Sequence, residues 1–114
     1  MEECLFCKIV RKEVPSTVVY EDDDIVAFND INPVAPVHVL LIPKKHISTF
    51  FGMEPGDEAL IGKLHQVAVK VARDLGLTEK GFRLVSNCQR GGGQLIFHLH
   101  YHLIAGRPLG WPPG

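Results

Sequence analysis

The sequence has few cysteines, no long hydrophobic run and no excess of one charge. Only three of its 114 residues are cysteine, and this odd, small number argues against a disulfide framework. The longest aliphatic run is Val39–Ile42, whereas a membrane helix needs about 20 residues. With 12 basic and 13 acidic residues the formal net charge is −1, whereas proteins that bind nucleic acid are usually basic. We therefore expect a small charged ligand as partner, and neither nucleic acid nor a membrane.

The start of the chain also lacks an apolar stretch. Residues Met1–Cys4 are acidic and do not resemble the beginning of a signal peptide. We therefore expect a cytoplasmic protein. The hydrophobic fraction of 46% and the charged fraction of 22% are ordinary for a globular chain. The length predicts a single domain covering residues 1–114.

Hydrophobic periodicity predicts the secondary structure. Apolar residues recur with a 3.6-residue period between Asp57 and Gly76, which indicates one long helix. The remaining expected elements are a short helix at 4–12 and strands at 17–21, 25–28, 37–42, 82–86 and 97–104. The strand at 37–42 is apolar on both faces and should be central. This order predicts an α+β fold with an antiparallel five-stranded sheet, whose exposed edge favours extension of the sheet across a homodimer.

Three histidines alternate with apolar residues near the end of the chain. Because a strand has a period of two, His98, His100 and His102 should share one face, while the other face packs on the long helix. Such a face could bind a metal ion. Alternatively, one imidazole could act as a nucleophile whose tautomer is set by its neighbours. Residue types alone leave both chemistries open.

The segment before these histidines is rich in glycine. Residues Asn87–Gln94 include three consecutive glycines, which allow backbone N–H groups to converge on an anion. The loop leads directly into the histidine segment. A phosphate held by this loop would therefore lie beside the imidazoles.

The motif at residues 97–104 resembles the signature of the histidine triad family, in which three histidines alternate with hydrophobic residues. The resemblance to the nucleotide-binding branch of that family extends over nearly the whole chain. It includes Asp30–Pro33, Pro36–Ile47, Gly92–Gln94 and the ending Trp111–Gly114. The resemblance implies a purine nucleoside phosphoramidase-like hydrolase that cleaves adenosine 5′-phosphoramidates or mixed adenylate anhydrides to AMP.

The same resemblance assigns roles to individual residues. His100 would attack the α-phosphorus to form an adenylyl-histidine, which water then hydrolyses. His102 and His38 match supporting histidines for phosphate contact and proton transfer. The residues that match nucleotide-binding positions are Asp30 at the ribose, Ile31 beside the purine, and Asn87, Gly93, Gln94 and Leu95 near the phosphate. Leu95 departs from the polar residue that relatives often carry, so the leaving-group preference is open.

Two of the cysteines have the spacing of a metal site. Cys4 and Cys7 form a Cys-x-x-Cys pair, which is typical of zinc binding but also compatible with packing in the core. Related bacterial proteins complete such a pair with histidines that match His46 and His98. The resemblance thus implies a structural Cys₂His₂ zinc site and no cofactor for catalysis. His65, at the edge of the long helix's apolar stripe, is expected at the surface.

Two other functions remain open at this point. The triad itself could hold a catalytic zinc, or the protein could bind nucleotides as a scaffold with weak catalysis. Activity that survives chelation would exclude the first alternative, and a turnover assay separates the second. In the homodimer, the tail with the chain's only tryptophan, Trp111, is expected to complete the partner's nucleotide site.

Overall fold

Two helices, two 3₁₀ turns and five strands make up the computed structural model, which describes residues 4–114. The expectation for the N-terminal sequence falls largely on residues 1–3, outside the described residues. The elements are α1 (Leu5–Val10), β1 (Val18–Glu21), β2 (Ile25–Asn29), β3 (Val37–Pro43), η1 (Phe50–Gly52), α2 (Asp57–Asp74), β4 (Arg83–Val85), η2 (Arg90–Gly92) and β5 (Tyr101–Ala105). All strand pairs are antiparallel, in the order β1-β2-β3-β5-β4. The predicted α+β class is confirmed.

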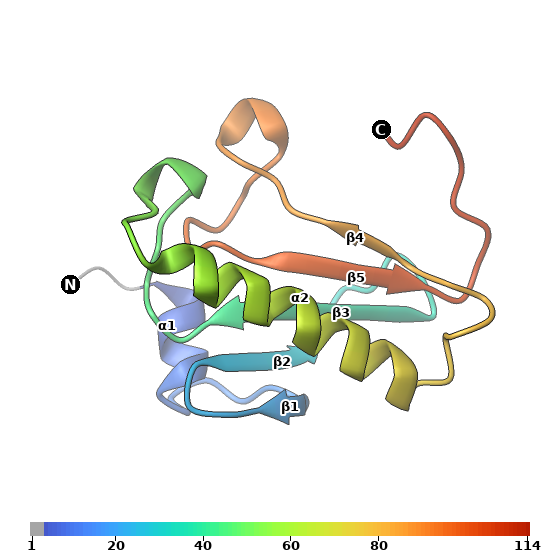
Figure 1. Cartoon of the computed structure of the whole chain (residues 1–114), viewed down its shortest axis with the longest axis horizontal. Coiled ribbons are helices and arrows are strands. Elements are labelled where there is room, and N and C mark those ends of the chain that lie inside the picture. The colour runs from blue at the N-terminus through green and yellow to red at the C-terminus, as the bar shows by residue number, and fades with distance from the viewer. Residues whose placement is uncertain (1–3) are drawn as a thin grey trace.

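The two helices cover opposite faces of this sheet (Figure 1). The apolar stripe of α2, including Leu64 and Val67, packs with Leu41, Leu99 and Leu103 in the larger core cluster. The short α1 covers one end of the other face in a second cluster. Its members are Phe6, Ile9, Val26, Phe28, Leu40 and Ile42. Because β3 lies between these clusters, it is buried along nearly its whole length, as its apolar sequence predicts.

The long helix ends where the sequence indicates. Gly76 has a φ of +75°, and Leu77 donates its backbone N–H to the carbonyl of Ala72. This left-handed geometry terminates helices and favours glycine. At the other end, the Asp57 carboxylate accepts the backbone N–H of Glu54 and pairs with Lys45 at 2.7 Å. The helix is thus fixed at both ends over the sheet.

The last strand is shorter than expected. The prediction of a strand from residue 97 is wrong, since β5 begins at Tyr101, where it pairs with Leu41 of β3. Beyond this point β3 ends at Pro43, which has no N–H to extend the ladder. Leu99 instead donates its backbone N–H to Ile47. The segment carrying His98 and His100 therefore runs off the sheet toward the loop after β3.

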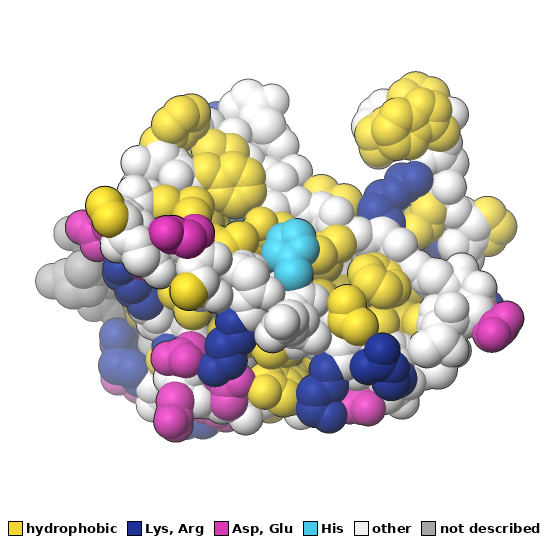
Figure 2. Space-filling view, in the orientation of Figure 1, with side chains coloured by type: hydrophobic (Ala, Val, Ile, Leu, Met, Phe, Trp, Pro, Cys, Tyr) yellow, Lys and Arg dark blue, Asp and Glu magenta, His cyan; other side chains and the backbone are white. Residues whose placement is uncertain are grey.

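The surface over α2 carries basic and acidic side chains side by side (Figure 2). Apolar side chains gather at two outlying places in this view, the region of η1 and the C-terminal tail, and Phe51 and Trp111 are both more than four-fifths exposed. His65 is exposed as predicted, with its ring 5.1 Å from that of Tyr101. Within residues 4–114, no helix has the length and apolarity that crossing a bilayer requires.

Candidate active site and metal-ligand cluster

His100 is buried with one ring nitrogen already engaged. Its Nδ1 lies 2.7 Å from the backbone carbonyl oxygen of His98, so Nδ1 carries the proton and donates it. The Nε2 lone pair is consequently available. Burial lowers the pKa of His100, which keeps the imidazole neutral. A neutral imidazole with a free nitrogen has the protonation state that a nucleophile needs.

His38 and His102 form a second, directly bonded pair. The backbone N–H of Val34 donates to Nδ1 of His38 at 3.1 Å, so the proton of a neutral His38 is on Nε2. Nε2 of His38 lies 2.9 Å from Nδ1 of His102. His102 therefore accepts this bond and carries its own proton on Nε2. Burial lowers the pKa of His102 to about 4, so this ring is neutral near pH 7.

Asp30 completes this group at the start of the loop that follows β2. Its Oδ2 lies 3.4 Å from Nε2 of His38, and its Oδ1 accepts the backbone N–H of Asn32. Its own backbone N–H donates to the carbonyl of His38. Neighbouring backbone groups thus hold both the carboxylate and the main chain of Asp30. The structure brings together Asp30, His38, His102 and, through a ring contact of 5.0 Å with His102, His100.

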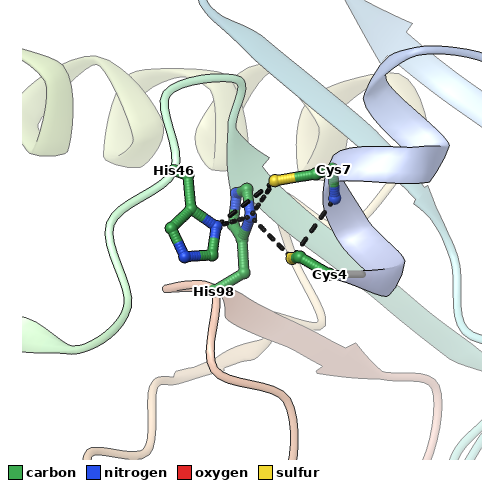
Figure 3. A group of neighbouring side chains, drawn as sticks. All are labelled: Cys4, Cys7, His46 and His98. Carbon is green, nitrogen blue, oxygen red and sulfur yellow. Dashed lines mark hydrogen bonds between the residues drawn. The ribbon is translucent and has the colours of Figure 1, made fainter. Parts of the chain in front are cut away.

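Cys4, Cys7, His46 and His98 converge on one point (Figure 3). Nδ1 of His98 lies 3.4 Å from Sγ of Cys4, 3.6 Å from Sγ of Cys7 and 3.2 Å from Nδ1 of His46. Sγ of Cys7 lies 3.3 Å from Nδ1 of His46. Tetrahedral zinc with ordinary bond lengths separates two nitrogens by about 3.3 Å and a nitrogen from a sulfur by about 3.6 Å. The four side chains therefore fit a tetrahedral metal ion.

The ring nitrogens of His46 and His98 that face away from the cluster support this fit. Nε2 of His98 donates to the carbonyl oxygen of Pro43 at 2.8 Å, which places its lone pair on Nδ1. Nε2 of His46 lies 3.3 Å from Oγ of Ser48. Such outer contacts fix the tautomer of metal-binding histidines. Cys4 also caps α1, since its Sγ accepts the backbone N–H of Cys7.

The glycine-rich loop is fastened by Gln94. Its side chain is 2% exposed, accepts the backbone N–H of Gln89 and donates to the carbonyls of Ser48 and Ile96. Its own backbone N–H donates to Gln89. Gln94, which was predicted to contact the phosphate, therefore donates its side-chain and backbone N–H groups within the protein. Its bond to Ser48 joins the glycine-rich loop to the segment beside the metal-ligand cluster.

The other predicted nucleotide residues lie around this loop and at the surface. Gly93 has a φ of +93°, and a Cβ there would lie 3.6 Å from Nδ2 of Asn87, so the two residues are close neighbours. Leu95 and Ile31 are 89% and 90% exposed. These apolar side chains are therefore accessible to a ligand.

Sequence reasoning overlooked the groups that set the tautomers of His38 and His98. The N–H of Val34 and the carbonyl of Pro43 are backbone atoms, which every chain supplies in quantity, so residue type gives no signal for them. It also gave no separate role to Phe6, which lies 5.1 Å from the ring of His100. Its position between the two cysteines of Cys-x-x-Cys is the signal that could have drawn attention to it.

Comparison with known proteins agrees with this geometry. The HIT domain model matches residues 11–109. The chain belongs to the HIT family. The match begins after α1, so the two cysteines lie outside it, whereas His46 and His98 lie within it.

Several relatives match almost the whole chain. An uncharacterised HIT-like protein of Synechocystis is 52% identical over 99% of this chain and 98% of its own length. The purine nucleoside phosphoramidase of Escherichia coli K12 is 47% identical over 96% of this chain and 92% of its own length. A solved HIT family hydrolase from Legionella pneumophila is 51% identical, covers 98% of this chain and 100% of its own, and has a TM-score of 0.96. These relatives support assigning this HIT protein as a hydrolase.

Proposed function

We propose that this HIT hydrolase cleaves adenosine 5′-phosphoramidates or mixed adenylate anhydrides to AMP through an adenylyl group on His100. The similarity to a purine nucleoside phosphoramidase supports the substrate class. The observation that carries the mechanism is the hydrogen bond from Nδ1 of His100 to the carbonyl of His98, since it directs the free Nε2 lone pair away from the backbone.

The proposed reaction has two displacements at phosphorus. First, Nε2 of His100 bonds to the α-phosphorus and the bond to the leaving nitrogen or oxygen breaks. In a phosphoramidate, the departing amine takes a proton from solvent water, while the Nε2–H of the neutral His102 would donate a hydrogen bond to the phosphate. Water then attacks the same phosphorus, the phosphorus–histidine bond breaks, and AMP leaves. His38 and Asp30 hold His102 in the tautomer that this hydrogen bond needs.

The remaining predicted residues would bind the nucleotide. Asp30 would accept the ribose hydroxyls and the exposed Ile31 would flank the purine. Asn87, Gly93 and the backbone at Leu95 would contact the phosphate, whose negative charge suits backbone N–H groups. Gln94, whose donors are engaged within the protein, would shape this loop. The exposed Leu95 would give the leaving group an apolar neighbour.

We further propose that Cys4, Cys7, His46 and His98 hold a structural zinc ion. Two thiolates and two imidazoles are preferred zinc ligands, and four protein ligands leave no position for water. When bound, zinc supplies folding free energy to α1 and the triad segment. Thiol ligands, and three free cysteines in all, suit a reducing compartment, which supports the proposed cytoplasmic location.

We propose one domain over residues 1–114 that pairs into a homodimer. The short edge strand β4 leaves backbone groups unpaired, and a two-fold partner beside it would extend the sheet. Trp111 is 84% exposed on a tail that stands off the body of the molecule (Figure 2). In the dimer this tail would complete the partner's site.

The chemistry is tested by mixing the protein with adenosine 5′-phosphoramidate and quenching in a denaturant that preserves phosphorus–nitrogen bonds. Mass spectrometry should find one adenylyl group on His100. Binding without turnover would instead indicate a scaffold protein. Turnover that disappears on chelation, while the protein stays folded, would indicate a metal-dependent hydrolase.

The dimer and its tail are tested separately. Light scattering should give twice the 12.7 kDa of one chain, and Trp111→Ala should alter the preference among leaving groups. A monomeric mass at micromolar concentration would contradict the dimer. An unchanged substrate profile would contradict the role of the tail.

A further inference from the structure

The nucleophile His100 is in contact with two other rings. The ring of Phe6 in α1 lies 5.1 Å away at an interplanar angle of 88°, and the ring of His102 lies 5.0 Å away at 61°. The first contact is an edge-to-face arrangement, which aromatic rings favour. Phe6 is 3% exposed and His100 is 7% exposed, so both rings are enclosed.

The hydrogen bond to His98 does not hold the His100 ring by itself. It fixes Nδ1, but a ring bonded at one nitrogen can still tilt around that atom. Nε2, which lies across the ring from the Cβ attachment, would be displaced by such a tilt. An enclosed neighbour set against the ring restricts that motion. Displacements of about 1 Å at a reacting atom can reduce a rate by about 100-fold.

Phe6 is itself fixed from two directions. Its ring packs edge-on against Phe28 of β2 at 5.6 Å and against His98 at 5.9 Å. Its backbone lies in α1 between Cys4 and Cys7, whose sulfurs approach Nδ1 of His98. The helix that carries Phe6 is thus in contact, through these two sulfurs, with the segment that carries the nucleophile.

We propose that Phe6 is a positioning residue for His100, which holds the ring so that Nε2 points at the substrate phosphorus. This inference rests on the proposed function of His100. The short helix α1 would then have two roles. With its N-cap it supplies two of the metal ligands, Cys4 and Cys7, and it also supplies the ring that packs against the nucleophile.

The test uses Phe6→Leu in the full-length protein, with adenosine 5′-phosphoramidate as the substrate. Loss of the rigid ring should lower kcat by about 10- to 100-fold while KM changes by less than about twofold, because the nucleotide contacts remain. NMR relaxation dispersion of the His100 ring carbons should show microsecond-to-millisecond motion absent from the wild type. The zinc content should be unchanged.

Ile9→Ala is the matched control. It removes a similar number of buried carbons from the same helix, and Ile9 packs in the same cluster as Phe6. It should lower the melting temperature and leave kcat within about twofold. If Phe6→Leu does not fold, Phe6→Met keeps the volume without the rigid ring.

Three results would overturn the positioning role. The first is a folded Phe6 variant with wild-type kcat, and the second is an equal loss of kcat in Ile9→Ala. The third is a loss of zinc from the Phe6 variant that parallels its loss of kcat. If the wild-type protein does not cleave the phosphoramidate, the proposed function fails. The dispersion of the His100 ring, wild type against variant, then decides the positioning role without reference to activity.

Discussion

Two groups of side chains in this protein each bring potential metal ligands together, but their protons are arranged in opposite ways. Cys4, Cys7, His46 and His98 place their ligand atoms within 4.8 Å of one another, and so do Asp30, His38 and His102. In the first group, the proton of His98 is directed outward to the carbonyl of Pro43. In the second, the N–H of Val34 occupies the outer nitrogen of His38 and forces its proton inward.

The difference explains why the first group suits a metal ion and the second does not. A metal ion needs lone pairs at the centre, and the first group offers them because backbone and hydroxyl oxygens surround its outer nitrogens. The second group has a proton at its centre, shared between His38 and His102 at 2.9 Å. Metal binding there would require His38 to lose its bond from Val34. Proximity of ligand atoms alone therefore does not define a metal site.

The largest expected effect comes from the residue between the two groups. His100→Ala removes the proposed nucleophile and should lower kcat by several orders of magnitude, which corresponds to at least about 4 kcal/mol in the barrier. Binding of AMP should persist, because the other nucleotide contacts remain. Steady-state kinetics and AMP titration measure the two. A variant that keeps more than about a tenth of the wild-type kcat would contradict the assignment.

The next effect concerns the metal-ligand cluster. Purified wild-type protein should contain close to one zinc ion per chain. Cys4→Ser should lose this metal and lower the melting temperature, because a closed four-ligand site contributes to folding. The kcat of the protein that remains folded should change little. Metal analysis and thermal melts provide the measurements.

Cys88→Ser is the matched control for the cysteine variant. Cys88 is free and lies outside the cluster, so its replacement should leave zinc content unchanged. Wild-type protein prepared without chelator and found free of zinc would refute the metal proposal.

Much of this architecture follows from the periodicity of the sequence. The apolar stripe of α2 and the doubly apolar β3 lie where predicted because burial on one or two faces leaves a clear pattern. The predicted start of β5 was wrong, because the residue at which this strand begins depends on where its partner β3 ends, at Pro43. The tautomers of His38 and His98 depend on backbone groups of Val34 and Pro43, and the buried role of Gln94 depends on loops distant in sequence. These features arise from tertiary structure and leave no local pattern.

A smaller effect should appear in the pH dependence of stability. Burial lowers the pKa of His102 from 6.5 to about 4. The unfolded chain therefore takes up a proton near pH 6.5, while the folded chain does so only near pH 4. The contribution of this neutral histidine is complete above pH 6.5 and declines as the pH falls toward 4. Melting temperatures between pH 7 and pH 5 should decline less in His102→Gln than in the wild type.

The exposed His65 provides the control for this pH series. His65→Gln should keep the wild-type decline, because that ring lies at the surface. Protonation of the metal-ligand cluster affects all three proteins alike and cancels in the comparison. An identical decline in His102→Gln would show that His102 is not the source.

The smallest expected effect is no change in metal content at all. Asp30→Asn removes a carboxylate from the second group, and zinc content should stay at the wild-type value, because the inward proton of His38 already excludes the ion. Titration of metal-free wild-type protein with zinc should accordingly show one tight site per chain. A second site of comparable affinity that Asp30→Asn abolishes would contradict the tautomer assigned from the Val34 contact. Imidazole ¹⁵N shifts of His38 examine the same point directly, since they distinguish a proton on Nε2 from one on Nδ1. If the proton is on Nε2, the two groups differ in kind although both bring ligand atoms close together.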